Sequence, residues 1–176
     1  MTSKFDSLEK NDLSFPLSPI ELEYWFKEPP KGVLCDIQES LKNSNFRWVR
    51  IYTASEINQM LNKIGDIGAV YKLIVVRRQE SGHINAIKVV GENSSYVLEK
   101  ELNIRKTLGN LRSSMFKVEV KYDPDKKPEK FIFYGGGFGH GVGMCQSGAK
   151  AIADKGKGYK EILRHYYREV EFKKIY

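Results

Sequence analysis

A histidine surrounded by glycines is the feature of this sequence that points most directly to chemistry. His140 lies in the stretch Phe131–Ala149, FIFYGGGFGHGVGMCQSGA, in which seven residues are glycine. Glycine loses more conformational entropy on folding than any other residue, so such a run indicates positive φ angles or close approach of a ligand to the main chain. The imidazole could donate a hydrogen bond to a ligand, bind a metal, or bond to nearby backbone and fix the loop.

The glycine run does not match a nucleotide-binding loop. A phosphate-binding loop needs Lys-Ser or Lys-Thr after G-x-x-x-x-G, and the dinucleotide fingerprint needs G-x-G-x-x-G. Neither spacing occurs among these glycines. The run instead predicts a strand over Phe131–Tyr134, an exposed turn that displays His140, and a helix beginning near Val142–Cys145. The first N–H groups of such a helix could hold an anionic or carbonyl group of a ligand.

Three further residues, Gln146, Cys145 and Cys35, carry amide or thiol groups that could take part in binding or catalysis. Gln146, one turn into the predicted helix, is a candidate for a polar ligand contact, with a helix cap as the alternative. Cys145 and His140 allow a thiol peptidase in which the histidine activates the thiolate. Cys35, His140 and Cys145 could contribute to a zinc site, although their spacing matches no structural zinc pattern. A small buried cysteine is the alternative for each thiol, and we expect no other cofactor.

Several segments occur in an order that is typical of one protein family. Residues 137–149 follow the pattern G-x-G-H-G-x-G-[M/L]-x-Q-x-G-A, and Lys157–Tyr159 and Glu161–Tyr167 come after it as KGY and EILRHYY. Phe46–Trp48 and Glu101–Leu108 lie upstream. Together these segments resemble the stage II sporulation protein D family, which also includes amidase-enhancer proteins. By this resemblance the substrate-binding residues are Gly137, Gly139, His140, Gly141, Gly143 and Gln146.

The resemblance implies a role at the bacterial cell wall. Members of the family are lytic transglycosylases, which cleave the bond from N-acetylmuramic acid to N-acetylglucosamine in peptidoglycan. The expected partners are therefore peptidoglycan glycan strands and a cell-wall amidase, and the expected location is the cell envelope or outside the cytoplasm. In the family a glutamate in a G-E-[M/V]-P motif is the catalytic acid, and this motif is absent from the chain. Because Glu119 and Glu161 have no motif support, we identify no catalytic residue and expect this chain to be inactive alone.

Two functions remain open from the sequence. The first is the substrate-binding part of a lytic transglycosylase whose catalytic glutamate is missing from this chain. The second is a non-catalytic cell-wall-binding or amidase-enhancing module that presents the same groove.

Composition agrees with a globular protein that binds an anionic partner. Hydrophobic residues make up 41% of the 176 residues, and the formal net charge is +7. A basic protein favours nucleic acid, a membrane surface or a carboxylate-bearing cell wall, with a solvated basic surface as an equal alternative from charge alone. The basic residues are scattered and accompany no nucleic-acid-binding motif, so we do not expect nucleic acid. No apolar run approaches the ~20 residues of a membrane span.

Hydrophobic periodicity predicts an α+β fold, with a mostly antiparallel sheet and a glycine-rich loop that leads into C-terminal helices. We assign 1–43 as a connecting segment with short helices and 44–176 as the C-terminal part of a larger domain of the resembled family. Strands are predicted over 45–53, 69–77, 84–90, 96–98, 116–121 and 131–134. Helices are predicted over 20–27, 54–65, 99–108, 142–155 and 159–167. His83 is expected in a solvated hairpin turn, and Tyr166 and Tyr167 are expected to pack the last helix against the sheet.

Overall fold

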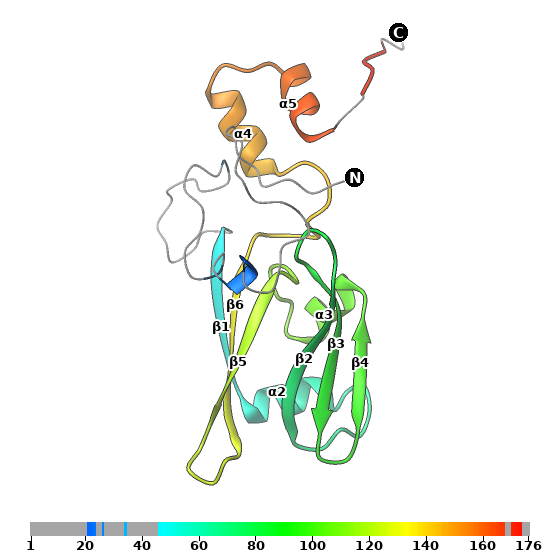
Figure 1. Ribbon diagram of the computed structural model, residues 1–176, viewed down its shortest axis with the longest axis vertical. Helices are drawn as coiled ribbons and strands as arrows, with labels where there is room; N and C mark the ends of the chain where they lie inside the picture. Colours follow the sequence, from blue (N-terminus) through cyan, green and yellow to red (C-terminus); the bar gives the residue numbers. More distant parts are fainter. Residues whose placement is uncertain (1–20, 24–25, 27–33, 35–45, 168–169, 174–176) are drawn as a thin grey trace.

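Two antiparallel three-stranded sheets form the body of the protein in this computed structural model, which describes residues 21–23, 26, 34, 46–167 and 170–173 (Figure 1). One sheet has the order β1-β6-β5, and the other has the order β2-β3-β4. The strands are β1 (Arg47–Thr53), β2 (Val70–Arg78), β3 (Ile84–Gly91), β4 (Ser95–Glu99), β5 (Phe116–Tyr122) and β6 (Pro128–Gly136). The helices are α2 (Ala54–Leu61), α3 (Glu101–Thr107), α4 (Gln146–Asp154) and α5 (Tyr159–Tyr166).

The predicted α+β class is confirmed, and the strands divide between two sheets. All six predicted strands occur within a few residues of their expected ends. Residues 21–23 and 26 are helical, inside the helix expected over 20–27. Cys35 and most of the predicted connecting segment 1–43 lie outside the described residues.

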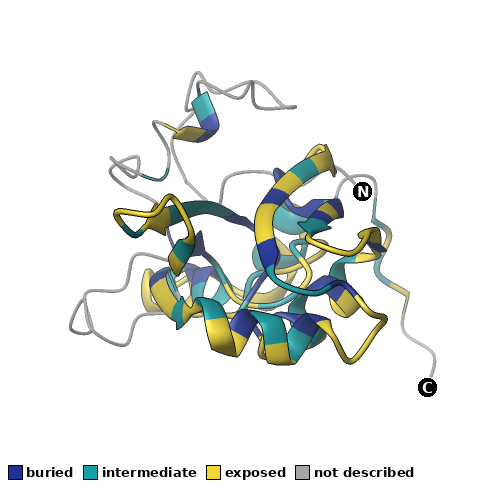
Figure 2. Ribbon diagram, turned by 90° about the horizontal axis from the view of Figure 1, so that it is seen from below, coloured by how far each residue is buried: buried dark blue, intermediate teal, exposed yellow. Residues whose placement is uncertain are grey.

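One hydrophobic core joins the two sheets. Phe116, Phe131 and Phe133 from the first sheet are fully buried in one cluster with Ile84 and Ile87 from the second. Bands of buried and exposed residues follow one another along the ribbons in Figure 2. Burying one large apolar side chain stabilises the fold by about 1.5–3 kcal/mol, so this shared core holds the two sheets together.

Local sequence signals start the first long helix. Thr53 caps α2, because its hydroxyl accepts a hydrogen bond from the N–H of Glu56 while the Glu56 carboxylate accepts one from the N–H of Thr53. Such a capping box satisfies two N–H groups that a helix start leaves without partners. On the inner side of α2, Ile57 and Leu61 are buried, as the i, i+4 spacing predicts.

The two C-terminal helices lie beyond one end of the sheets, on the far side of the glycine loop (Figure 1). α5 contacts α4, and Met144 in the loop donates its N–H to the hydroxyl of Tyr167 at 3.3 Å. Tyr167 thus bonds the helix to the glycine loop, so our prediction that this residue packs against the sheet was wrong. No helix in the described part of the chain has both the length and the apolar character that crossing a bilayer requires.

Candidate functional site

Backbone hydrogen bonds hold the start of the glycine loop against the edge of the first sheet. Gly136 donates its N–H to the carbonyl of Met115 at 3.0 Å, and Gly139 donates to the carbonyl of Arg112 at 2.8 Å. Gly139 also forms an isolated parallel bridge with Ser113. The loop is therefore fixed to the segment that precedes β5, up to the residue before His140.

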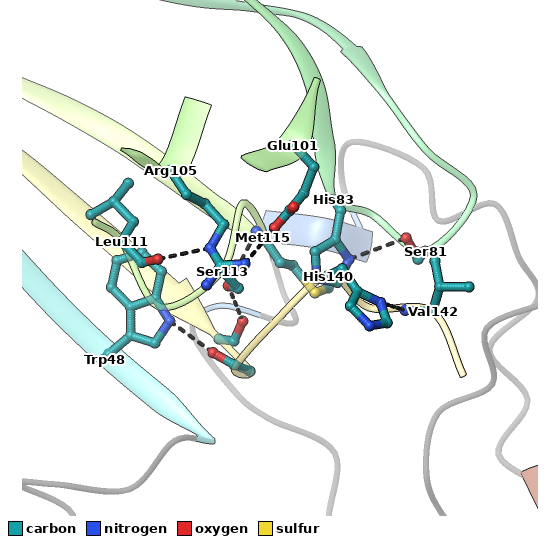
Figure 3. Close-up of polar contacts among 12 residues, drawn as sticks. Trp48, Ser81, His83, Glu101, Arg105, Leu111, Ser113, Met115, His140 and Val142 are labelled. Atoms are coloured by element: carbon teal, nitrogen blue, oxygen red, sulfur yellow. Dashed lines mark hydrogen bonds and ion pairs between the residues drawn. The ribbon is translucent and has the colours of Figure 1, made fainter. Parts of the chain in front are cut away.

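Two side chains from separate elements bind carbonyl groups of the loop (Figure 3). The indole N–H of Trp48 donates to the carbonyl of Gly137 at 3.1 Å, and the hydroxyl of Ser113 donates to the carbonyl of Gly136 at 2.6 Å. Trp48 also covers Gly135 so closely that a Cβ there would overlap the indole. This contact explains why the strand ends in glycine before the loop begins.

A partly enclosed ion pair orders the segment that carries Ser113. Arg105 Nη1 lies 2.9 Å from a carboxylate oxygen of Glu101, and their side chains are only 17% and 11% exposed. The same guanidinium donates from Nε to the carbonyl of Leu111 at 2.8 Å. The hydrogen bonds thus run from α3 to the turn after it, and the next residues hold the loop (Figure 3).

His83 packs against the glycine loop and is buried, with 7% of its surface exposed. Its Nδ1 lies 3.1 Å from the hydroxyl oxygen of Ser81. A Cβ on Gly141 would overlap the His83 ring, and Gly141 also has a φ of +71°. Our prediction of a solvated His83 was therefore wrong. Gly141 covers the ring, and because Gly141 is distant in sequence, no local pattern around His83 could predict this contact.

Burial keeps His83 neutral at ordinary pH. Removal of the ring from water lowers its pKa to about 4, and positive charge from Arg105 and Arg78 acts in the same direction. The direction follows because desolvation penalises the charged form of a base. A neutral, packed ring makes His83 a wall of the site rather than a group that exchanges protons near pH 7.

His140 is exposed, and its ring is oriented by its own loop. Nδ1 accepts a hydrogen bond from the N–H of Val142 at 2.9 Å. A neutral imidazole carries its proton on the other nitrogen when one nitrogen accepts, so the ring holds its proton on Nε2. The loop therefore presents an N–H donor at the surface, beside the buried ring of His83 (Figure 3).

Apolar side chains accompany His140 on the loop, and the sequence analysis did not single them out. Phe138 is 68% exposed, and Val142 and Met144 are also exposed. Exposed apolar side chains that gather in one place are typical of a surface that binds a ligand or partner. The alternation of glycine with large residues was the signal that could have identified them.

The helix after the loop begins at Gln146, which is exposed. The cap is Cys145, whose sulfur accepts from the N–H of Gly148 at 3.4 Å. The alternative reading of Gln146 as the helix cap was therefore wrong, and its side chain is placed in solvent next to the loop. Gly143, with a φ of +91°, faces the hydroxyl of Tyr167.

The hydrogen bond at Nδ1 of His140 bears on the predicted metal and thiol chemistry. A metal on Nε2 would require the proton to move to Nδ1, which would abolish the hydrogen bond from Val142. Among the described residues, no three histidine, cysteine or acidic side chains gather as metal ligands, and Cys35 is outside that part of the chain. The Cys145 sulfur is used as a cap, and Nδ1 of His140 accepts a backbone N–H instead of a thiol proton.

The two glutamates considered in the sequence analysis make ordinary surface contacts. Glu119 lies 2.9 Å from the ammonium of Lys117. Glu161 pairs with Lys157, and these interactions and the N–H of Gly158 lower the pKa of its carboxyl group. A general acid in glycoside cleavage needs a raised pKa, so Glu161 has the opposite tuning.

Comparison with protein families matches residues 30–143 to a domain described as Domain of unknown function (DUF8618). The chain belongs to this family. The matched residues include β1–β6 and the loop through Gly143, so the DUF8618 region contains both sheets and His140 but not Gln146.

Named relatives of this DUF8618 protein confirm the resemblance drawn from the glycine motif. The amidase enhancer of Bacillus subtilis (strain 168) is 40% identical over 86 residues, which cover 45% of this chain and 12% of the relative. Stage II sporulation protein D of the same strain is 31% identical over 128 residues, which cover 72% of this chain and 33% of the relative. Stage II sporulation protein D of Bacillus amyloliquefaciens is 54% identical over 35 residues, 20% of this chain and 10% of the relative. The matches thus span no more than a third of these relatives' lengths.

Proposed function

We propose that this chain recognises peptidoglycan glycan strands in the cell envelope through the loop 137–146. The observation that carries the proposal is the orientation of His140, whose Nε2–H faces solvent while Nδ1 is held by Val142. Glycan hydroxyl and N-acetyl groups accept hydrogen bonds, so a fixed exposed donor fits them. Phe138 adds an apolar surface of the kind on which a sugar ring packs. The names of the relatives, a sporulation protein and an amidase enhancer, support a role connected with the cell wall.

Within this proposal, the chain acts as the substrate-binding part of a transglycosylase whose acid is supplied from outside these residues. Glu119 pairs with Lys117, and the partners of Glu161 lower the pKa of its carboxyl group, which is the opposite of what a general acid needs. The alternative is a non-catalytic module that binds the wall or a cell-wall amidase, and the amidase-enhancer relative favours it. Product analysis separates the two, because only the first would yield anhydro-muropeptides once the catalytic part is added.

The test is sedimentation of the protein with purified peptidoglycan, followed by mass spectrometry of the soluble products. We expect binding without release of anhydro-muropeptides. The variant His140→Ala should bind roughly fivefold more weakly, because one hydrogen bond contributes about 0.5–1.5 kcal/mol. His140→Gln, which retains an N–H donor, should lose less.

The matched control is Lys127→Ala, because Lys127 is exposed in the turn between β5 and β6, at the end of the sheet opposite the loop. It should bind like the unaltered protein. Equal binding by His140→Ala, with its fold intact by circular dichroism, would remove the assigned role of the imidazole. Release of anhydro-muropeptides by the chain alone would show that an acid lies within these residues.

A further inference from the structure

A pocket of about 700 Å³ lies on the edge of the second sheet, next to the site. Its walls combine apolar side chains, among them Phe26, Val75 and Val76, with charged ones. Three cations line it, Arg77, Arg78 and Lys117, against two exposed carboxylates, Glu23 and Glu80. The lining therefore has an excess of positive charge beside an apolar wall.

Arg78 is the unusual member of this set. Its guanidinium is partly buried and donates to the carbonyls of Gly82 and Phe116, at 2.7 and 2.8 Å, and so connects the two sheets. Among the described residues no carboxylate lies within ion-pair distance of it, whereas Arg77 pairs with Glu99 and Lys117 with Glu119. Carbonyl dipoles satisfy N–H groups but carry no net negative charge.

A buried cation without a counter-ion carries a desolvation cost that a bound anion would offset. Burial lowers the pKa of Arg78 to about 10, which reflects that cost. The group remains charged at pH 7. A carboxylate fits the geometry of guanidinium better than other small anions of biological polymers do, apart from phosphate, because both groups are planar and can form paired hydrogen bonds.

The pocket and the glycine loop share one turn of the chain. Gly82 lines the pocket, and the next residue, His83, packs against Gly141 in the loop. Through this turn the pocket adjoins the loop that carries His140.

We propose that this pocket, with Arg78 at its wall, is a subsite for a carboxylate of the glycan strand bound at the loop. The inference rests on the proposed function, because it takes the ligand to be peptidoglycan. Two sources supply that carboxylate. Strands without peptides expose the lactyl carboxylate of N-acetylmuramic acid, whereas in peptide-bearing strands that group is an amide and the carboxylates belong to the peptide.

The experiment compares binding of three ligands of similar length: uncharged oligomers of N-acetylglucosamine, peptide-free glycan strands, and peptide-bearing strands. The readout is the ratio of affinities for the carboxylate-bearing strand and the uncharged oligomer. We expect a ratio above one for the unaltered protein and a loss of about tenfold in that ratio for Arg78→Met, because a charge-assisted hydrogen bond is stronger than a neutral one. Affinity for the uncharged oligomer should stay the same.

A lysine pair keeps the test decisive if Arg78→Met fails to fold, since Arg78 also joins the sheets. Lys117→Met removes a charge at the pocket and should lower the ratio roughly threefold, whereas Lys88→Met removes an exposed charge outside the pocket and should not. A higher affinity for peptide-free strands assigns the lactyl carboxylate, and a higher affinity for peptide-bearing strands assigns the peptide.

Some outcomes would overturn the subsite. One is equal binding of charged and uncharged ligands by the unaltered protein. The other is a folded Arg78→Met variant whose ratio of affinities for the two ligands is unchanged. If Arg78→Met does not fold, an unchanged ratio in Lys117→Met overturns it. If the unaltered protein binds the uncharged oligomer, glycan recognition stands even though the subsite fails. If it binds none of the three ligands, the proposed function itself fails.

Discussion

Substitution of alanine at Gly141 tests the contact that holds the loop against His83. The matched comparison is Gly137→Ala, since the two glycines have similar φ angles, +71° and +76°, but different surroundings. No atom lies within 4 Å of a Cβ at Gly137, whereas a Cβ at Gly141 overlaps the His83 ring. Both substitutions reduce the entropy of the unfolded chain by the same amount, so that contribution cancels.

The size of the expected difference follows from the strain of the backbone and from the overlap with the His83 ring. Placing an alanine in the left-handed region costs about 1–2 kcal/mol at either position. At Gly141 the buried ring of His83 must also move, and insertion of a methyl group into a packed region costs about 1–3 kcal/mol. We therefore expect Gly141→Ala to destabilise the fold by about 2 kcal/mol more than Gly137→Ala.

Urea denaturation measures this difference. With a slope of about 2 kcal/mol per molar urea, the midpoint of Gly141→Ala should lie roughly 1 M below that of Gly137→Ala. In the double variant with His83→Ala, the loss of stability should be smaller than the sum of the two single losses, because truncation of His83 removes the ring that the new methyl group would overlap. Equal midpoints for the two single alanine variants would refute the packing of His83 on the loop.

Three other measurements test the support of the site. The pKa of His83 is about 4 in the folded state and about 6.5 in the unfolded chain, so its contribution to stability is complete above pH 6.5 and decreases by about 3 kcal/mol as the pH falls to 4. His83→Gln should remove that part of the pH dependence of urea unfolding, and an unchanged pH profile would contradict a buried ring. Ser113→Ala removes the hydroxyl that donates to the carbonyl of Gly136 at 2.6 Å and should lower the free energy of unfolding by about 1–2 kcal/mol. A loss below 0.3 kcal/mol, roughly the error of such a measurement, would show that this bond is not formed. Arg105→Met breaks an enclosed ion pair with Glu101 and should lower the thermal midpoint by several degrees, from a loss of roughly 3 kcal/mol, whereas Arg105→Met with Glu101→Leu should recover part of it.

The sequence was sufficient for most of the elements, because their signals are local. Ile57 and Leu61 show helical spacing and are buried in α2, and the alternation around Trp48 marks β1. The i, i+4 spacing of Glu101 and Arg105 permits an ion pair on a helix. The hydrogen bond from Arg105 to the carbonyl of Leu111 could not be predicted, because no periodicity in the sequence reports on a backbone carbonyl.

The parts that the sequence did not yield depend on contacts between distant segments. His83 looked like a turn residue because its neighbours, Ser81 and Gly82, are turn formers, and only the fold brings Gly141 onto its ring. Division of the strands into two sheets has the same origin, since the pairing of β1 with β6 is not encoded by either strand alone. Arg78 likewise reads as one more basic residue until its two carbonyl partners are known.

The alternation of glycine with larger residues in 137–143 separates two kinds of variation during evolution. Each glycine there has a positive φ, so a substitution at those positions changes the path of the backbone. Phe138, His140 and Val142 lie between them and are exposed, so a substitution there mainly changes what is offered to a ligand, with one bond within the loop lost at His140. A lineage can therefore alter the preferred ligand one residue at a time without rebuilding the loop, and an engineer could vary the same three positions as a library.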